Sequence, residues 1–137
     1  MSENRMRIVI DTNVYLSNFI FGGFTAKVCS DCFETQEVFI SEFIKKEISQ
    51  KLLEKFKYPL EKTKFVLKTI ELVTQEVVPT NLLPDVCRDK DYNAVLQLCQ
   101  FVNAEFLITG DKDLLTLENF KSTRIVTPRL FFEAMNL

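Results

Sequence analysis

The sequence of 137 residues contains no histidine and no tryptophan, and it has only three glycines and four prolines. Without histidine, the chain lacks the side chain that most often acts as a general base. The few glycines and prolines leave little room for flexible linkers. No apolar run approaches the roughly 18 residues that a membrane-spanning helix needs, and the first residues, MSENRM, lack the features of a secretion signal. We therefore expect a single soluble, cytoplasmic domain over residues 1–137.

The four cysteines do not form a zinc-binding pattern. Cys29 and Cys32 have the spacing of a zinc pair, but Cys87 and Cys99 are twelve residues apart and no histidine is present to complete a set of four ligands. The residues around Cys29 and Cys32 show apolar positions at helical spacing. We therefore predict that these two cysteines are ordinary thiols in the core.

Charge is distributed unevenly, although the formal net charge is only −2. Residues 45–68 contain eight lysines and three glutamates, whereas residues 85–118 contain seven acidic and three basic residues. The lysine-rich segment is typical of a solvated helical face. The alternative is a flank that attracts phosphate groups beside a metal site.

Short β-rich runs alternate with segments of helical periodicity along the chain. Strands are predicted at residues 7–10, 37–40, 76–78, 105–109 and 124–127. Helices are predicted at residues 12–20, 25–34, 42–57, 60–74, 91–102 and 129–136. Continuous apolar strands such as RIVI indicate a sheet that is covered on both faces. We therefore expect an α/β fold with a central, mainly parallel sheet of five strands.

Acidic residues follow two of the predicted strands. Asp11 comes directly after the first strand, and Asp111 and Asp113 follow the fourth, separated from it by Gly110. In an open α/β sheet, ligands bind beyond the carboxyl ends of the strands. If the two strands are neighbours, the carboxylates converge and require a divalent cation such as Mg²⁺ or Mn²⁺. The alternative is that Asp11 and Asp111 only cap the helices that follow them.

Further acidic residues lie on the helices between these strands. Glu47 falls on the apolar side of its predicted helix, but Lys51 stands four residues later and is an alternative partner at the surface. Asp89 and Asp91 precede an apolar stripe and therefore stand at or near the start of a helix. Either residue could cap that helix while the other points into the cleft.

Six segments together resemble the PIN-domain family, in its branch of toxin components of bacterial toxin–antitoxin systems. In chain order they are IVIDTNV, FIFGG, SEFIKKEI, VCRDKDYN, FLITGDKDLL and RIVTPRLFFE, and they extend from about residue 7 to residue 135. The resemblance implies a three-layer α/β/α sandwich and cleavage of single-stranded RNA by Mg²⁺ or Mn²⁺ held in an acidic pocket. It also implies a small antitoxin protein as a partner.

The resemblance also suggests roles for individual residues. It implies that the catalytic acids are Asp11, Glu47, Asp89, Asp111 and Asp113. The metal ligands would come from Asp11, Glu47, Asp89, Asp91 and Asp111. Polar residues that support these acids would be Thr12, Asn13, Asn93 and Thr109.

One position departs from the family pattern, in which the late helix begins with R-D-x-x-D-N. Tyr92 stands where the second acid of this motif is expected. Asp89 precedes Tyr92 by three residues and would share its helical side, whereas Asp91 would point about a quarter-turn away. We therefore expect Asp89 to supply the missing carboxylate and to approach the cleft more closely than Asp91.

The chemistry that we expect is metal-assisted hydrolysis of a phosphodiester, because no histidine is available as a general base. The lysine-rich helices would hold the RNA backbone. The alternative is a catalytically silent PIN-like module that binds RNA or a protein. A phosphatase of the haloacid-dehalogenase type is excluded, because it needs a second aspartate two residues after the first and the chain has Asn13 there.

A homodimer is a further expectation from the resemblance. Phe131 and Phe132 near the end of the chain would serve as its apolar contacts if they are exposed. The interpretation that we favour for these two side chains is that the C-terminal helix docks on its own sheet.

Overall fold

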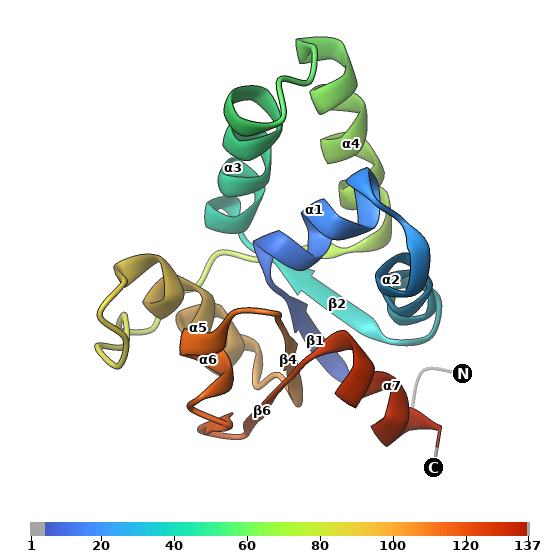
Figure 1. Ribbon diagram of the computed structural model, residues 1–137. Coiled ribbons are helices and arrows are strands. Elements are labelled where there is room, and N and C mark those ends of the chain that lie inside the picture. Colours follow the sequence, from blue (N-terminus) through green and yellow to red (C-terminus); the bar gives the residue numbers. More distant parts are fainter. Residues whose placement is uncertain (1–4, 137) are drawn as a thin grey trace.

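A six-stranded sheet in the order β3-β2-β1-β4-β6-β5 forms the centre of the computed structural model, which describes residues 5–136 (Figure 1). All neighbouring strands are parallel except β5, which runs antiparallel to β6. The strands are β1 (Arg7–Ile10), β2 (Glu37–Ile40), β3 (Gln75–Glu76), β4 (Phe106–Ile108), β5 (Asn119–Phe120) and β6 (Thr123–Val126). The predicted α/β fold with a mainly parallel central sheet is confirmed.

Five of these strands lie at the predicted positions, to within about two residues. The prediction of five strands is wrong by one, because β5 was not expected. This strand has two residues, and Lys121 in the turn after it has a left-handed φ of 53°. So short a strand has no alternation of apolar and polar positions from which it could be predicted.

Seven α-helices and one π-helix occur in the described residues 5–136. They are α1 (Thr12–Ile20), α2 (Gly23–Thr35), α3 (Glu42–Gln50), η1 (Lys51–Lys55, the π-helix), α4 (Leu60–Val73), α5 (Lys90–Val102), α6 (Lys112–Leu115) and α7 (Pro128–Met135). The predicted helix at residues 42–57 is therefore α3 continued by η1. The helix α6 was not predicted, because a single turn shows no periodicity.

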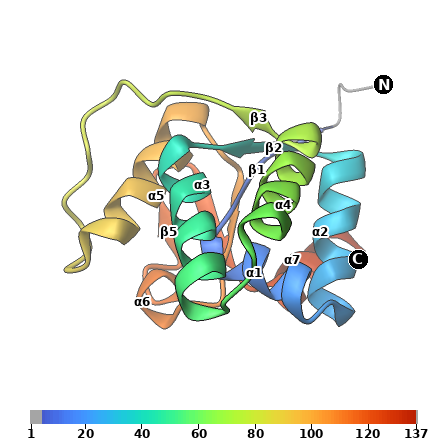
Figure 2. The ribbon, with the colours of Figure 1, turned by 90° about the horizontal axis from the view of Figure 1, so that it is seen from above.

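The helices form a layer on each face of the sheet, as the two views show (Figures 1 and 2). Helices α1 to α4 pack against one another on one face, where α7 contacts α2 and strands β4 and β6. Helix α5 contacts β1 from the other face, and α6 contacts β6. Crossovers between parallel strands are right-handed, so the direction of a crossover decides which face of the sheet its helices cover. The chain first moves from β1 toward β3 and then returns past β1 toward β6, so the two sets of helices lie on opposite faces. The molecule is thus an α/β/α sandwich.

The two central strands are buried on both faces. Ile8, Val9 and Ile10 of β1 are fully buried, as is Leu107 of β4. Because helices cover both faces of β1, every inward-facing position of the strand is apolar, and the sequence RIVI shows no alternation with polar residues.

Replacing Leu107 with alanine should lower the free energy of unfolding by about 3 kcal/mol, because it removes buried methyl groups and leaves a cavity between the helical layers. Urea unfolding monitored by circular dichroism measures this change. Leu82→Ala is the matched control, since the Leu82 side chain is 91% exposed and should change stability by less than about 0.5 kcal/mol. Equal losses in the two variants would contradict this assignment of the core.

The C-terminal helix packs against its own sheet and does not expose its phenylalanines. Phe131 is buried and meets Phe106 of β4 edge to face, with ring centroids 5.3 Å apart. Phe132 is partly buried and meets Phe24 of α2 in the same manner. The favoured interpretation, in which the C-terminal helix docks on its own sheet, is therefore confirmed.

Cys29, Cys32 and Cys99 are buried free thiols, as predicted for Cys29 and Cys32. Burial raises the pKa of Cys29 and of Cys32 to about 12, so that both stay protonated at neutral pH. Among the residues that the structure describes, no helix has both the length and the apolar character that crossing a membrane requires.

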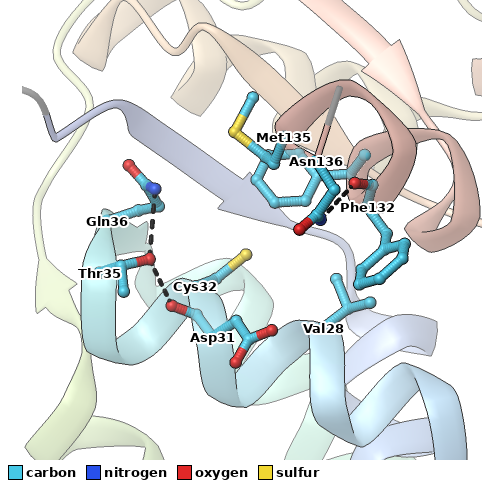
Figure 3. A pocket seen from close by; sticks show the side chains of 9 residues that line it. Val28, Asp31, Cys32, Thr35, Gln36, Phe132, Met135 and Asn136 are labelled. Carbon is cyan, nitrogen blue, oxygen red and sulfur yellow. Dashed lines mark hydrogen bonds between the residues drawn. The ribbon is translucent and has the colours of Figure 1, made fainter.

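A cavity of about 290 Å³ lies between α2 and α7 (Figure 3). Its lining includes Val28, Cys32, Phe132 and Met135, and Asp31 is its acidic residue. Helix α2 ends just before β2 begins, so this cavity extends toward the amino-terminal edge of the sheet. It therefore does not involve the strand ends at which acidic residues were predicted to gather.

Candidate functional site

The carboxyl ends of β1 and β4 meet at the point where the strand order reverses. From β1 the chain continues to β2 and β3 on one side, and β4 then pairs with β1 on the other side. Ile10 pairs with Ile108, and the backbone N–H of Asp11 donates to the carbonyl of Ile108 at 3.0 Å. Asp11 and Thr109 consequently stand side by side just beyond the sheet, where open α/β folds bind their ligands.

Asp11 is a buried carboxylate with hydrogen bonds at both oxygens. Its side chain is 4% exposed. Oδ1 accepts from the backbone N–H of Thr12 at 2.9 Å and caps α1, and Oδ2 accepts from Thr109 Oγ1 at 2.8 Å. Burial raises the pKa of Asp11 and the charge of Asp111 adds to this, while the two hydrogen bonds and the charge of Lys51 oppose it. Asp11 therefore caps α1, as one alternative predicted, and it also stands at the carboxyl ends of β1 and β4.

Glu47 reaches the same place from α3. Its Oε1 accepts from Thr12 Oγ1 at 2.7 Å, so that Thr12 links the glutamate to the start of α1. Burial raises the pKa of Glu47, the Thr12 hydrogen bond and Lys51 lower it, and the charges of Asp91 and Asp11 raise it. No Glu47–Lys51 ion pair occurs among residues 5–136, so the alternative of a surface pair does not apply.

A polar cavity of about 80 Å³ lies between α1, the α3–η1 segment and the start of α5. Its lining contains acids, a lysine, three other polar side chains and one valine: Asp11, Thr12, Asn13, Glu47, Lys51, Asp89, Asp91, Tyr92 and Val95. Three segments that are distant in the sequence therefore bring four carboxylates to one small cavity. We refer to it below as the acidic cavity.

The two aspartates at the start of α5 both line the acidic cavity, and Asp89 is the one that caps the helix. Asp89 is the N-cap of α5, in an extended conformation, and its Oδ1 accepts from the backbone N–H of Asp91 at 2.9 Å. Because α5 begins at Lys90, the argument that Asp89 shares a helical side with Tyr92 does not hold. Asp91 is the one of the two whose charge raises the pKa of Glu47.

Asp111 is connected to the acidic cavity through Tyr92 and is not part of its lining. The phenol O–H of Tyr92 donates to Asp111 Oδ2, while Asp111 Oδ1 accepts from the backbone N–H of Asp113 at 2.9 Å and caps α6. The hydrogen bond to Asp111 raises the pKa of Tyr92 well above its usual value. Of the three acids expected to line one cleft, the cavity therefore brings together Asp11 and Glu47.

Asp113 is exposed and lines a neighbouring cavity of about 210 Å³. That cavity also contains Cys87, Arg88 and Leu117, and Tyr92 separates it from the acidic cavity. Asp113 is thus near the strand ends but on the outer side of Tyr92.

The supporting polar residues divide into two groups. Thr109 is fully buried and links two acids, because its hydroxyl donates to Asp11 and accepts from the backbone N–H of Asp111 at 3.0 Å. Asn93 is buried elsewhere, where its amide accepts from the backbone N–H groups of Val86 and Cys87. It fixes the long segment before α5, which follows a wide arc in Figure 2, and does not line the acidic cavity.

Lys51 and Asn13 form a contact that was not predicted. Lys51 Nζ donates to Asn13 Oδ1 at 3.2 Å, at the rim of the acidic cavity. The spacing of Lys51 from Glu47 was the available signal, but it suggested a pair with Glu47 and not with a residue of α1.

The donor chemistry of the acidic cavity fits Mg²⁺ or Mn²⁺, which prefer carboxylate and water oxygens. Among residues 5–136, however, no three acidic or cysteine side chains stand close enough to chelate an ion as they are arranged. Both oxygens of Asp11 already accept hydrogen bonds. Since Mg²⁺ usually keeps several of its waters, the carboxylates of this cavity would contact such an ion partly through water.

The sequence pattern of the PIN domain family matches residues 7–113 of the chain. The chain belongs to the PIN domain family. This PIN domain is also 31% identical to the uncharacterized protein MJ1680 of Methanocaldococcus jannaschii, over 97% of this chain and 94% of that protein.

Two solved toxin structures share the fold of this PIN domain. One is VapBC2 from Rickettsia felis, bound to a DNA fragment from its promoter, with a TM-score of 0.66, 9% identity and coverage of 88% of this chain and 97% of that chain. The other is VapC20 of Mycobacterium tuberculosis, a toxin that cleaves the sarcin–ricin loop, with a TM-score of 0.61, 13% identity and coverage of 85% and 98%. At these identities the likeness concerns the fold alone.

Proposed function

We propose that this PIN domain is a metal-dependent endoribonuclease that cleaves single-stranded RNA and acts as the toxin of a toxin–antitoxin pair. The observation that carries the proposal is the pairing of Asp11 and Glu47 at one cavity beyond the strand ends, with Thr12 bonded to both. Asp11 is buried and Glu47 is half-buried, and burial raises the pKa of both carboxyls. Carboxylates with perturbed pKa values that converge on one cavity are candidates for a functional site.

The proposed mechanism assigns a task to each side chain. A bound Mg²⁺ or Mn²⁺ would lower the pKa of the attacking water and stabilise charge on the phosphate. Asp11, Glu47 and Asp91 would hold the ion. Thr109 keeps Asp11 oriented through its hydrogen bond, and Thr12 does the same for Glu47. Because the chain has no histidine, its carboxylates are the groups left to accept a proton from water.

The remaining predicted acids have secondary tasks in this proposal. Asp111 would act at the outer edge of the site, where Tyr92 and the backbone of Asp113 hold both of its oxygens. Asp89 would position Asp91 by capping α5. Asp113 would face the part of the RNA that leaves the acidic cavity on the other side of Tyr92.

The test is cleavage of a fluorescently labelled single-stranded RNA by the purified protein. We expect cleavage with Mn²⁺ or Mg²⁺ and none with EDTA, because no other group of the site is able to activate water at neutral pH. Activity that returns when Mn²⁺ is added in excess over EDTA shows that the loss came from metal removal. Cleavage that continues in EDTA would contradict the proposal.

A second candidate is a catalytically silent module that binds RNA or a protein. The observation in its favour is Tyr92 itself, which stands where the family pattern has an acid and donates a hydrogen bond to Asp111 Oδ2. If neither Mn²⁺ nor Mg²⁺ supports cleavage across a panel of RNAs, this second candidate accounts for the acidic cavity better than the nuclease.

The proposed partners are a small antitoxin and a second copy of the chain, in the cytoplasm. The fold likeness to the VapBC2 structure supports an antitoxin partner. Phe131 is buried against the chain's own sheet and Phe132 is half-buried beside α2, so neither residue by itself supports a dimer contact.

A further inference from the structure

Lys51 stands at the junction between α3 and the π-helix η1. Its backbone is still right-handed helical, and its N–H donates to the carbonyls of Glu47 and Ile48. Here Lys51 contacts Asn13 of α1 and does not form the ion pair with Glu47 that the α-helical spacing suggests.

Among the described residues that line the acidic cavity, Lys51 is the one that carries a positive charge. An ammonium carries three N–H donors, and the contact to Asn13 uses one of them. In residues 5–136, Lys51 has no ion-pair partner within 4.0 Å. Its charge therefore faces the carboxylates without being neutralised by any one of them.

Other lysines of the segment 45–68 are engaged elsewhere. Lys45 forms ion pairs with Glu71 and Glu76 at 2.7 and 2.8 Å. Lys62 lies over the ring of Tyr58, 4.3 Å from its centroid. Lys46 points to solvent near Glu42. Lys51 is thus the lysine of this segment that lines the acidic cavity.

A phosphate group that approaches four carboxylates is repelled unless a cation stands among them. Asn13 holds the Lys51 ammonium at the rim, where the incoming backbone would pass. We propose that Lys51 binds a non-bridging phosphate oxygen of the single-stranded RNA that enters the acidic cavity, and that Asn13 positions its ammonium for this contact. This inference rests on the proposed nuclease function and assigns the residue that binds the backbone of its substrate.

The test measures RNA binding without cleavage. A labelled single-stranded RNA is titrated by fluorescence anisotropy with the Asp11→Asn protein in EDTA, over a series of salt concentrations. Lys51→Ala in this background should weaken binding by about five- to tenfold and reduce the slope of log affinity against log salt by about 0.7, the value for one phosphate contact to a single strand. Lys51→Arg should retain most of the affinity, because it keeps the charge.

Lys46→Ala is the matched control on the preceding helix α3, since the Lys46 side chain is 73% exposed and lies 3.9 Å from Glu42. It should leave the affinity within about twofold. A backbone contact also predicts the same loss for two RNAs of unrelated sequence. Thermal melting of each variant establishes that a loss of binding is not a loss of folding.

The outcomes separate this inference from the proposed function. If Lys51→Ala binds RNA as well as its parent, with an unchanged salt slope, or if the parent binds no RNA, the inference is overturned whatever the cleavage assay shows. If binding depends on Lys51 but the Asp11-containing protein cleaves no RNA with Mn²⁺, the Lys51 contact stands and the nuclease proposal fails. If binding depends on Lys51 and cleavage occurs, both stand.

Discussion

Asp11→Asn should reduce RNA cleavage by at least about 100-fold, the scale on which even the partners of metal ligands affect metal-dependent activity. The amide carries no charge and is a poorer ligand than the carboxylate, so the ion would be held weakly. Single-turnover cleavage of a labelled RNA at saturating Mn²⁺ measures the loss. A matched control is Asp31→Asn, because Asp31 lines the cavity between α2 and α7 and not the acidic cavity.

The same substitution should make the protein more stable. Burial raises the pKa of Asp11, so the folded state holds the proton of this carboxyl more tightly than the unfolded state does. Its contribution to stability is therefore present below the unfolded pKa and is lost as pH rises through the folded pKa. In EDTA at pH 7, Asp11→Asn should gain about 1 kcal/mol in the free energy of unfolding, a few degrees in melting temperature.

The gain should shrink as the pH is lowered toward 3.8, the ordinary pKa of an aspartate, because the parent then carries a neutral carboxyl as well. Thermal melting at several pH values follows this change. An Asp11→Asn protein that is both inactive and less stable at pH 7 would show that Asp11 serves the fold and not a site.

Tyr92→Asp should raise the affinity for Mn²⁺ by about tenfold or more, measured by calorimetric titration, and should increase cleavage. The substitution removes the phenol that occupies Asp111 Oδ2 and adds a carboxylate at the wall of the acidic cavity. The two changes act in the same direction, since a hard cation gains one oxygen ligand and Asp111 is released.

Tyr92→Phe separates these two contributions. It removes only the hydroxyl, so any gain in Mn²⁺ affinity comes from the release of Asp111 and not from a new ligand. If both variants bind Mn²⁺ as the parent does, Tyr92 does not limit the site. If neither variant nor the parent cleaves RNA, the acidic cavity belongs to a silent binding module.

Much of the fold could be predicted because its signals are local. The apolar run of β1, its parallel neighbours and the helices between them follow from periodicity over a few residues. The prediction placed Asp11 at the sheet edge correctly, since a parallel strand ends at one edge and β1 lies beside β4. The elements that were missed, β5 and α6, are too short to carry a period.

The packing of the acidic cavity could not be predicted in the same way, because it depends on how distant segments dock. Whether Glu47 would turn to Thr12 or to Lys51 depended on the position of α3 against α1. Whether the Lys51 ammonium would contact Glu47 or Asn13 depended on the same docking of α1 beside the end of α3. Neither contact leaves a spacing pattern, since the partners lie 35 and 38 residues apart in the chain.

The sequence by itself determined the class of the fold, the strand ends at which acids stand and the absence of a histidine base. Only the tertiary structure decided that Asp89 caps α5 while the charge of Asp91 raises the pKa of Glu47. It also decided that the Tyr92 hydroxyl donates a hydrogen bond to Asp111. The physical reason is that a strand or helix is stabilised by neighbours in the sequence, whereas the direction of a polar side chain depends on which hydrogen-bond partner the packed layers bring within about 3 Å.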